Sequence, residues 1–170
     1  MLYGKELIEK LQNTINSNKE TINNRFDRIS DGSTDMDDCF VSQHFDEMAI
    51  SEAEKKIKLI NNGGAAWFNE YATLDGQLVN SAECITQYGW TRRFEMPNGE
   101  VVFSSAHTAK GLAKKGLKEV RCLRPAWYEF KSCGTGMMGA YSGDYVLVPS
   151  DVNYATGEKA SEEPIKIEEI

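Results

Sequence analysis

Apolar residues recur at helical spacing over the N-terminal part of the chain. One row has a spacing of seven residues and consists of Met1, Ile8, Ile15, Ile22 and Ile29. Residues spaced in this way lie along one face of a helix, and a strict seven-residue repeat is also the pattern of coiled-coil strands. The row therefore predicts a first helix. Its apolar face has two alternative partners: a neighbouring helix of the same chain, or a second copy of the chain in a homodimer.

A second helix is predicted over 36–62, after the turn-forming stretch 30–35. Asp, Gly and Ser are common in such turns because they hydrogen-bond locally or accept positive φ. The broad apolar face of the second helix comprises Met36, Phe40, Phe45, Met48, Ala49, Ala53, Ile57 and Ile60. Gly63 and Gly64 then provide a C-terminal stop. Two helices joined by a short turn form an antiparallel hairpin.

The periodicity changes after Gly64 and becomes typical of strands. An aromatic-rich strand is predicted over 65–74, and an alternating stretch predicts another over 84–96. The pair Asn98-Gly99 accepts positive φ at low cost, so it predicts a tight turn into a strand over 100–103. This is the clearest hairpin signal in the sequence.

Downstream of that hairpin, the pattern predicts a short helix over 106–115 and strands over 117–123 and 141–148. Pro125 is expected to break or edge the first of these strands. The fold class is therefore α+β, with an N-terminal antiparallel helical hairpin and a mainly antiparallel β-sheet of about five or six strands carrying one short helix. The predicted organisation is a helical hairpin over 1–62, an aromatic-rich β domain over 64–149, and an acidic mobile tail over 150–170.

The composition is that of an ordinary globular protein, with 41% hydrophobic and 26% charged residues among 170. No apolar run approaches the roughly 18 residues that span a bilayer, and the N-terminus lacks the apolar stretch of a signal peptide. The cysteines never form a CxxC pair; they are Cys39, Cys84, Cys122 and Cys133. This pattern indicates reduced, mostly buried thiols, so we expect a soluble cytoplasmic protein without membrane association.

Charge is divided along the chain, whose formal net charge is −7 at pH 7. The stretch 31–54 contains acids and no Lys or Arg. Carboxylates along a rigid helix can imitate the charge of a nucleic acid and occupy the basic groove of a nucleic-acid-handling protein. The candidate partner-binding residues of this acidic face are Asp35, Asp37, Asp38, Asp46 and Glu47. A solvated helix face accounts for the same residues without any partner.

The segment 90–131 is basic by contrast, with nine Lys or Arg residues against four acids. Lys110 and Lys114 share one face of the predicted short helix because they are four residues apart. A basic surface attracts the nucleic-acid backbone, so direct nucleic-acid binding is a second hypothesis. Its candidate residues are Arg92, Arg93, Lys110, Lys114 and Arg121.

Two kinds of bound group find little support in the sequence. The string from Gly134 to Gly139 has the spelling of a dinucleotide-binding loop, but a turn and a strand follow it where a helix is required. Among the potential metal ligands only Cys39 and His44 are close, and on a helix they point away from each other. We therefore predict no cofactor and no metal ion.

Catalytic groups are equally incomplete. A cysteine nucleophile could be paired with His44 or His107, but the sequence brings no thiol close to a base in a suitable arrangement. Ser104, Ser105 and His107 are neighbours in the sequence, whereas catalytic groups are normally assembled from separate elements. We therefore assign no catalytic residue.

These patterns favour a non-enzymatic interaction protein that binds a macromolecular partner, expected to be a protein, through an acidic helical surface. Small acidic proteins of phages and other mobile elements often inhibit or assist nucleic-acid-handling machinery, and the analogy here rests on charge and size. Two alternatives stay open: a nucleic-acid-binding protein that uses the basic segment 90–131, and a small enzyme with a Cys/His site.

Overall fold

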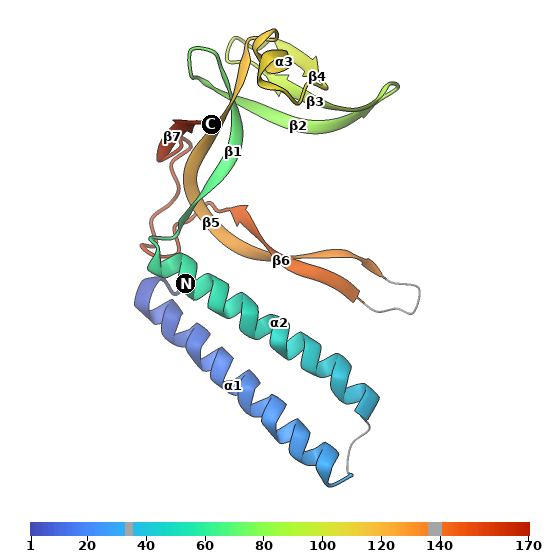
Figure 1. Cartoon of the computed structure of the whole chain (residues 1–170). Helices are drawn as coiled ribbons and strands as arrows, with labels where there is room; N and C mark the ends of the chain where they lie inside the picture. The colour runs from blue at the N-terminus through green and yellow to red at the C-terminus, as the bar shows by residue number, and fades with distance from the viewer. Residues whose placement is uncertain (33–35, 136–140) are drawn as a thin grey trace. The chain divides into compact units, whose positions relative to one another are not determined.

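A computed structural model describes the backbone of residues 1–32, 36–135 and 141–170, and the side chains of residues 1–32, 42–132 and 143–170. The chain is α+β, as the sequence predicted, with an N-terminal helix pair followed by a mostly antiparallel open sheet and a short helix (Figure 1). The helices are α1 (Gly4–Ser30), α2 (Met36–Asn61) and α3 (Ala109–Ala113). The strands are β1 (Ala65–Thr73), β2 (Leu78–Thr86), β3 (Gly89–Glu95), β4 (Val101–Ser104), β5 (Leu117–Thr135), β6 (Tyr141–Pro149) and β7 (Lys166–Glu169).

Two compact units are built from discontinuous parts of the chain. Unit 1 comprises Met1–Ala66 and Pro125–Ala160, and unit 2 comprises Trp67–Arg124 and Ser161–Ile170. The long strand β5 therefore contributes its first part to unit 2 and its second part to unit 1. The units do not follow the sequence blocks expected from periodicity, because the second half of β5 and strand β6 belong with the helices.

The helix pair of unit 1 brings the seven-residue row of α1 against α2 (Figure 1). Ile15 is buried, and Ile8, Ile22 and Ile29 are half-buried. Ile15 also shares a hollow with Ile57 of α2. The four isoleucines of the row are thus covered by a helix of the same chain, which was one of the two alternatives, whereas Met1 precedes α1 and is exposed. The homodimer stays a prediction.

Residues 125–160 complete unit 1 around the end of α2. β5 and β6 pair as antiparallel strands, and Ala126 N donates to the Gly64 carbonyl at 3.1 Å. The ring of Trp127 stacks on Tyr154 at 3.8 Å between centroids, and Lys56 of α2 lies 4.8 Å over the Trp127 ring. Aromatic stacking and a cation over an aromatic face both stabilise such contacts.

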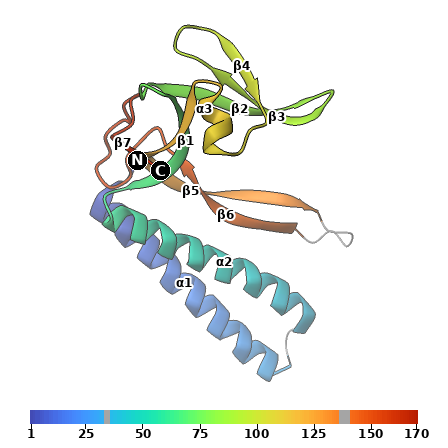
Figure 2. The same cartoon turned by 45° about the horizontal axis from the view of Figure 1, so that its top comes forward.

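Unit 2 is an open sheet in which neighbouring strands follow the order β4-β3-β2-β1-β5, with β7 paired to β5. The short helix α3 lies against one side of this sheet (Figure 2). Its Leu112 packs into a buried cluster with Val79, Phe94 and Leu117. Phe94 meets the ring of Tyr71 edge to face at 5.0 Å, which is a favourable aromatic geometry. This cluster forms part of the core of unit 2 beside a second buried cluster of Ala72, Val120 and Cys122.

The sequence reading of 84–96 as one strand is wrong. The structure divides this stretch between β2 and β3, which pair antiparallel around a turn at Gln87 and Tyr88. Gly89 has φ of 107°, a value that only glycine adopts readily, and this makes the turn possible. The second hairpin is confirmed: Gly99 has φ of 84°, and β3 pairs with β4.

Pro125 was expected to break or edge its strand, and the break does not occur. β5 continues through it, and the pairing partner changes at this point: Val120 to Leu123 pair with β7, whereas β6 pairs from Ala126 onward. Proline lacks a backbone N–H, so a position between two ladders can accept it. Its carbonyl still accepts a hydrogen bond from Ser150 N at 2.8 Å.

The tail after residue 150, which we expected to be mobile, contains regular structure. Its last part forms β7, and Arg121 of β5 donates to Glu168 at 2.6 Å. The predicted short helix is shorter than 106–115 and begins after Thr108, whose hydroxyl accepts from Gly111 N. Within the described part of the chain, no helix is long and apolar enough to cross a membrane.

Candidate interaction surface

The end of the β2–β3 hairpin exposes large apolar side chains. Ile85 and Trp90 face each other across the two strands and are 69% and 71% exposed. Tyr88, in the turn between them, is 91% exposed. Phe103 on β4 is also exposed. We call these four residues, Ile85, Tyr88, Trp90 and Phe103, the hairpin-tip patch.

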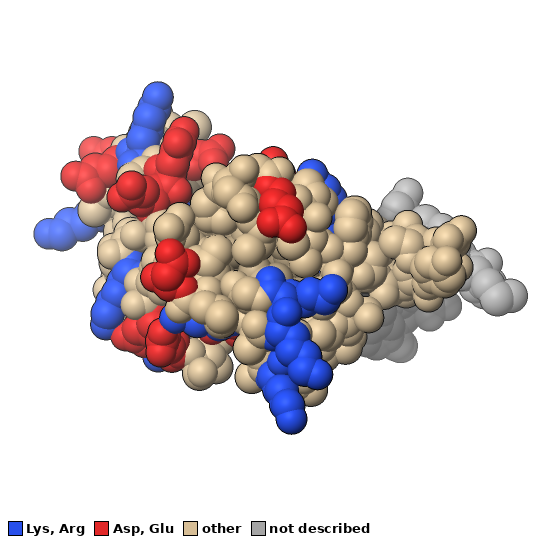
Figure 3. Space-filling view, turned by 90° about the horizontal axis from the view of Figure 1, so that it is seen from above, with Lys and Arg blue, Asp and Glu red and all other residues tan. Residues whose placement is uncertain are grey.

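Three residues of the hairpin-tip patch, Ile85, Tyr88 and Trp90, lie in a stretch without charge. Residues 84–91 contain no Lys, Arg, Asp or Glu. In Figure 3, the projecting end of the hairpin accordingly shows no charged side chain, whereas Lys and Arg gather on the same face over α3. Apolar residues scattered singly on a surface are ordinary, but a cluster of large apolar side chains without intervening charge is typical of a binding surface.

Along one face of β3, the side chains pass from core to solvent within a few residues. Phe94 is buried, Arg92 is half-buried and Trp90 is exposed. These three residues lie on the same face because side chains alternate along a strand. The covering helix α3 contributes Leu112 beside Phe94. The core therefore ends at Arg92, and the β2–β3 hairpin extends beyond the part of the sheet that α3 covers.

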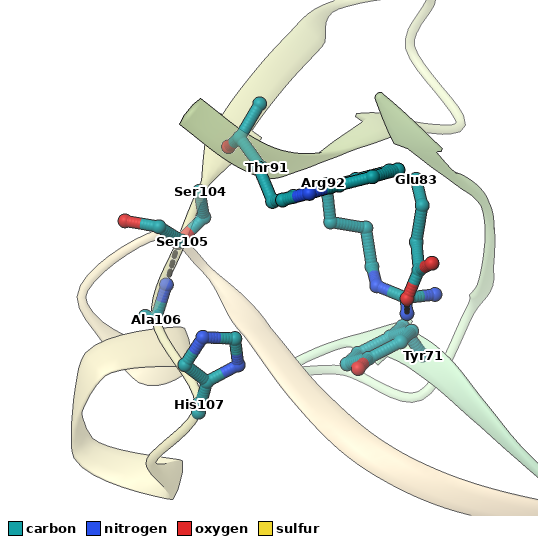
Figure 4. A pocket seen from close by; sticks show the side chains of 9 residues that line it. Tyr71, Glu83, Thr91, Arg92, Ser104, Ser105, Ala106 and His107 are labelled. Atoms are coloured by element: carbon teal, nitrogen blue, oxygen red, sulfur yellow. Dashed lines mark hydrogen bonds and ion pairs between the residues drawn. The ribbon is translucent and has the colours of Figure 1, made fainter. Parts of the chain in front are cut away.

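A pocket of about 230 Å³ lies where the core ends. Its lining residues are Tyr71, Glu83, Trp90, Thr91, Arg92, Ser104, Ser105, Ala106 and His107. Figure 4 shows the imidazole of His107 and the ring of Tyr71 directed into this space. Arg92 lies 5.1 Å over the Tyr71 ring and donates to Glu83 at 2.7 Å, so much of its charge is neutralised within the chain.

The pocket brings together the sequence neighbours Ser104, Ser105 and His107, but as parts of a turn rather than as a catalytic set. Ser104 is buried, and its Oγ accepts from Ala106 N at 3.1 Å (Figure 4). In the described part of the chain, no hydrogen bond links His107 to either serine. Nucleophilic catalysis needs a base within hydrogen-bond reach of the nucleophile.

A second hollow of about 380 Å³ borders the hairpin-tip patch itself. Its lining residues are Thr86, Gln87, Tyr88, Trp90, Thr91, Phe103, Ser104 and Ser105. This lining includes no charged side chain, and it combines three aromatic rings with hydroxyl and amide groups. Such a composition matches the aromatic-rich, charge-poor centres of protein interfaces.

The acidic face predicted on the second helix is only partly described. Asp46 forms an ion pair with Arg25 of α1 at 2.8 Å, so it serves the helix pair. Glu47 accepts from Gln43 of its own helix at 2.8 Å. Asp35 and the side chains of Asp37 and Asp38 lie outside the described residues. Binding of a partner through this face stays a prediction.

Most of the predicted basic residues have acidic partners. Arg93 pairs with Glu95 at 3.3 Å, and Arg121 pairs with Glu168 at 2.6 Å. Arg92 is held by Glu83, as described above. The remaining candidates are Lys110 on α3 and Lys114, which directly follows this helix. Nucleic-acid binding through a basic face would therefore depend mainly on these lysines.

The cysteine and metal alternatives find no new support. Cys122 is buried and Cys84 is half-buried, both as free thiols. Burial raises the pKa of the Cys122 thiol above its usual range, which disfavours the reactive thiolate. Among the described residues, no group of His, Cys, Asp and Glu could hold a metal ion. Cys39, Cys133 and the glycine string after Gly134 fall outside the described side chains.

The sequence analysis missed the hairpin-tip patch. The signal was present in the uncharged stretch around Tyr88 and Trp90, but reading it as part of a continuous strand implied that a sheet would cover one side. Comparisons with known proteins add no guide to function: no family model, no curated protein and no solved structure matches the chain.

Proposed function

We propose that this chain is a non-enzymatic binding protein that contacts a protein partner through the hairpin-tip patch. The observation that carries the proposal is the exposed cross-strand pair Ile85 and Trp90, at 69% and 71% exposure, with Tyr88 between them. Folding alone gives these side chains little stabilisation, because apolar surface contributes only when it leaves water. Burial against a partner would supply that gain.

The residue types support a protein as the partner. Tryptophan and tyrosine dominate the energetic centres of protein interfaces, and charged residues are depleted there. Nucleic acid would instead demand unpaired cations beside the aromatic rings. Arg92 and Arg93 are the cations nearest in sequence to Trp90, and each is paired with a glutamate. These pairings favour a protein over a nucleic acid.

Site-specific photocrosslinking tests the proposal in an extract of the source organism. The photoreactive residue p-benzoylphenylalanine is placed at Tyr88 and, as a matched control, at Leu74, which is 54% exposed in the same unit. We expect a discrete protein adduct from position 88 that is absent from position 74. The adduct should also be lost when Trp90→Ala is combined with the position-88 crosslinker, because the neighbouring contact is removed.

Two results would count against this function. Identical adducts from positions 88 and 74 would indicate nonspecific capture, and an adduct that survives Trp90→Ala would place the contact elsewhere. Nucleic-acid binding is tested separately by filter binding across a salt series. Affinity that falls steeply with salt and is lost in a Lys110→Gln, Lys114→Gln variant would favour the nucleic-acid alternative. The acidic helix face and a nucleic-acid-handling partner stay predictions.

A further inference from the structure

β4 covers only part of the neighbouring strand β3. It pairs with Arg92, Arg93, Phe94 and Glu95 of β3 and then ends at Ser104. On its other side, β3 stays paired with β2 down to Gly89. The segment Gly89–Thr91 therefore has a strand on one side only within the described part of the chain. Figure 2 shows this hairpin extending past the end of β4.

The backbone of Trp90 is directed toward that open side. Met96 N donates to the Glu100 carbonyl at 2.8 Å, so residue 96 presents its backbone groups to the β4 side. Backbone groups alternate along an antiparallel strand, so Phe94, Arg92 and Trp90 share this direction. Phe94 and Arg92 have partners in β4, opposite Val102 and Ser104. The N–H and carbonyl of Trp90 have no such partner strand.

The hollow of about 380 Å³ lies beside this unpaired backbone. It is lined by the Trp90 and Tyr88 side chains on the hairpin and by Phe103, Ser104 and Ser105 at the end of β4. Two independent features thus coincide: backbone groups without a ladder partner, and a space beside them walled by uncharged side chains. An extended peptide segment satisfies both, since it offers backbone donors and acceptors together with side chains.

Charged side chains protect β7, another strand with one paired side, in a way that Gly89–Thr91 lacks. The four residues of β7 include Lys166, Glu168 and Glu169, and charged side chains discourage further strand pairing. From Gly89 to Thr91 and from Val101 to Ser105, the chain has neither a charge nor a proline. An uncharged occupant follows, because a charged side chain placed against this lining would lose its hydration without an opposite charge.

We propose that an extended, uncharged segment of a partner protein adds to β3 in line with β4 and pairs with the backbone of Trp90. This inference rests on the proposed function, and it specifies the partner as a strand. The partner's residue opposite Trp90 would donate to its carbonyl and accept from its N–H. Side chains on either side of that residue would contact Tyr88 and Phe103.

A peptide titration of the full-length chain tests the inference by ¹⁵N–¹H NMR. The probe is the blocked peptide acetyl-Thr-Val-Thr-Val-Thr-amide, and its control is the same peptide methylated on every backbone nitrogen. We expect the amide resonances of Gly89, Trp90 and Thr91 to shift and the Trp90 amide to exchange more slowly. The methylated control should bind about tenfold more weakly, because it cannot donate backbone hydrogen bonds.

Each remaining outcome overturns strand addition. Equal binding of both peptides would show apolar contact without backbone pairing, and it would leave the proposed binding surface intact. Absence of any shift at millimolar peptide would exclude an uncharged strand as the occupant. Self-association of the free chain that Trp90→Ala abolishes would identify a second copy in place of a partner. Absence of a specific photocrosslink from position 88 is a separate result: it counts against the proposed function, whereas equal binding of the two peptides counts against strand addition only.

Discussion

Two sets of apolar side chains in this molecule differ in how far they are buried. The row on α1, represented by Ile15, is buried or half-buried because α2 of the same chain covers it. The pair at the hairpin tip, Ile85 and Trp90, is mostly exposed although the two residues face each other across β2 and β3. Periodicity identifies the side chains that share a face, whereas the extent of the covering element decides which of them are buried.

The transition can be located on β3 itself. Phe94 lies under Leu112 of α3 and is 1% exposed, whereas Trp90 lies four residues away on the same face and is 71% exposed. The two sets therefore differ in whether another element of the same chain packs over them. A set without such a covering element is available to another molecule, and substitutions should separate the two cases by their effect on stability.

The largest contrast is expected between Phe94 and Trp90. Phe94→Ala should destabilise unit 2 by about 4 kcal/mol, because it removes a fully buried ring from the core. Trp90→Ala should change the free energy of unfolding by less than about 0.5 kcal/mol. Urea denaturation followed by unit 2 NMR resonances measures both. Comparable losses in the two variants would show that Trp90 is part of the core.

The helix pair offers the same comparison with a smaller effect. Ile15→Ala should destabilise unit 1 by about 3 kcal/mol, since Ile15 is 2% exposed against α2. Phe26→Ala on the same helix should be nearly neutral, because Phe26 is 50% exposed. Circular dichroism at 222 nm reports helix loss in a urea series. A large cost at Phe26 would indicate that a second copy covers this side of α1.

The ion pair between Arg25 and Asp46 should contribute about 1 kcal/mol. Its side chains are 17% and 22% exposed, so water screens the pair less than a fully exposed one. A double-mutant cycle with Arg25→Met and Asp46→Ala isolates the coupling energy. The exposed pair Gln43 and Glu47 serves as the control, with no measurable coupling expected. If Asp46→Ala left stability unchanged, Asp46 would again be available for a partner.

The smallest effect concerns the attachment of β7 at low pH. Hydrogen bonds from Lys166 and Arg121 lower the pKa of Glu168, and one from Lys118 lowers that of Glu169. A carboxylate with a lowered folded-state pKa stabilises above its unfolded-state pKa of about 4.3, and this contribution is lost as pH falls through the folded value. The protection factors of the β7 amides, which already take the intrinsic exchange rate at each pH into account, should therefore decrease at acidic pH. A Glu168→Gln, Glu169→Gln variant should lose this pH dependence.

Local patterns predicted the helices and one hairpin well. The seven-residue row and the double glycine after α2 placed both long helices, and Asn98-Gly99 placed the turn between β3 and β4. The β2–β3 turn was not predicted, because Gln87 and Tyr88 are not typical turn residues. Only Gly89 marks this turn, and a single glycine inside an alternating stretch also fits a strand.

The features that the sequence did not predict depend on pairing between residues far apart in the chain. Pro125 is accepted because β5 changes partners there, and β7 exists because Arg121 and its neighbours meet the distant tail. Neither fact can be read from neighbouring residues. The same holds for the candidate site. The sequence showed that Trp90 lies among uncharged residues, but its exposure depends on the end of β4 at Ser104, which the sequence did not reveal.

The division of β5 between the units has a consequence for how the gene can be dissected. Residues 67–124 of unit 2 are inserted between the two parts of unit 1, and residues 161–170 of unit 2 follow the second part. No single truncation can therefore isolate one complete unit from the other. On the ribosome, the helix pair emerges early and must wait for residues 125–160 before unit 1 is complete. A chain that ends prematurely after the helices lacks residues 125–160 and should be degraded by proteases, because unit 1 cannot be completed.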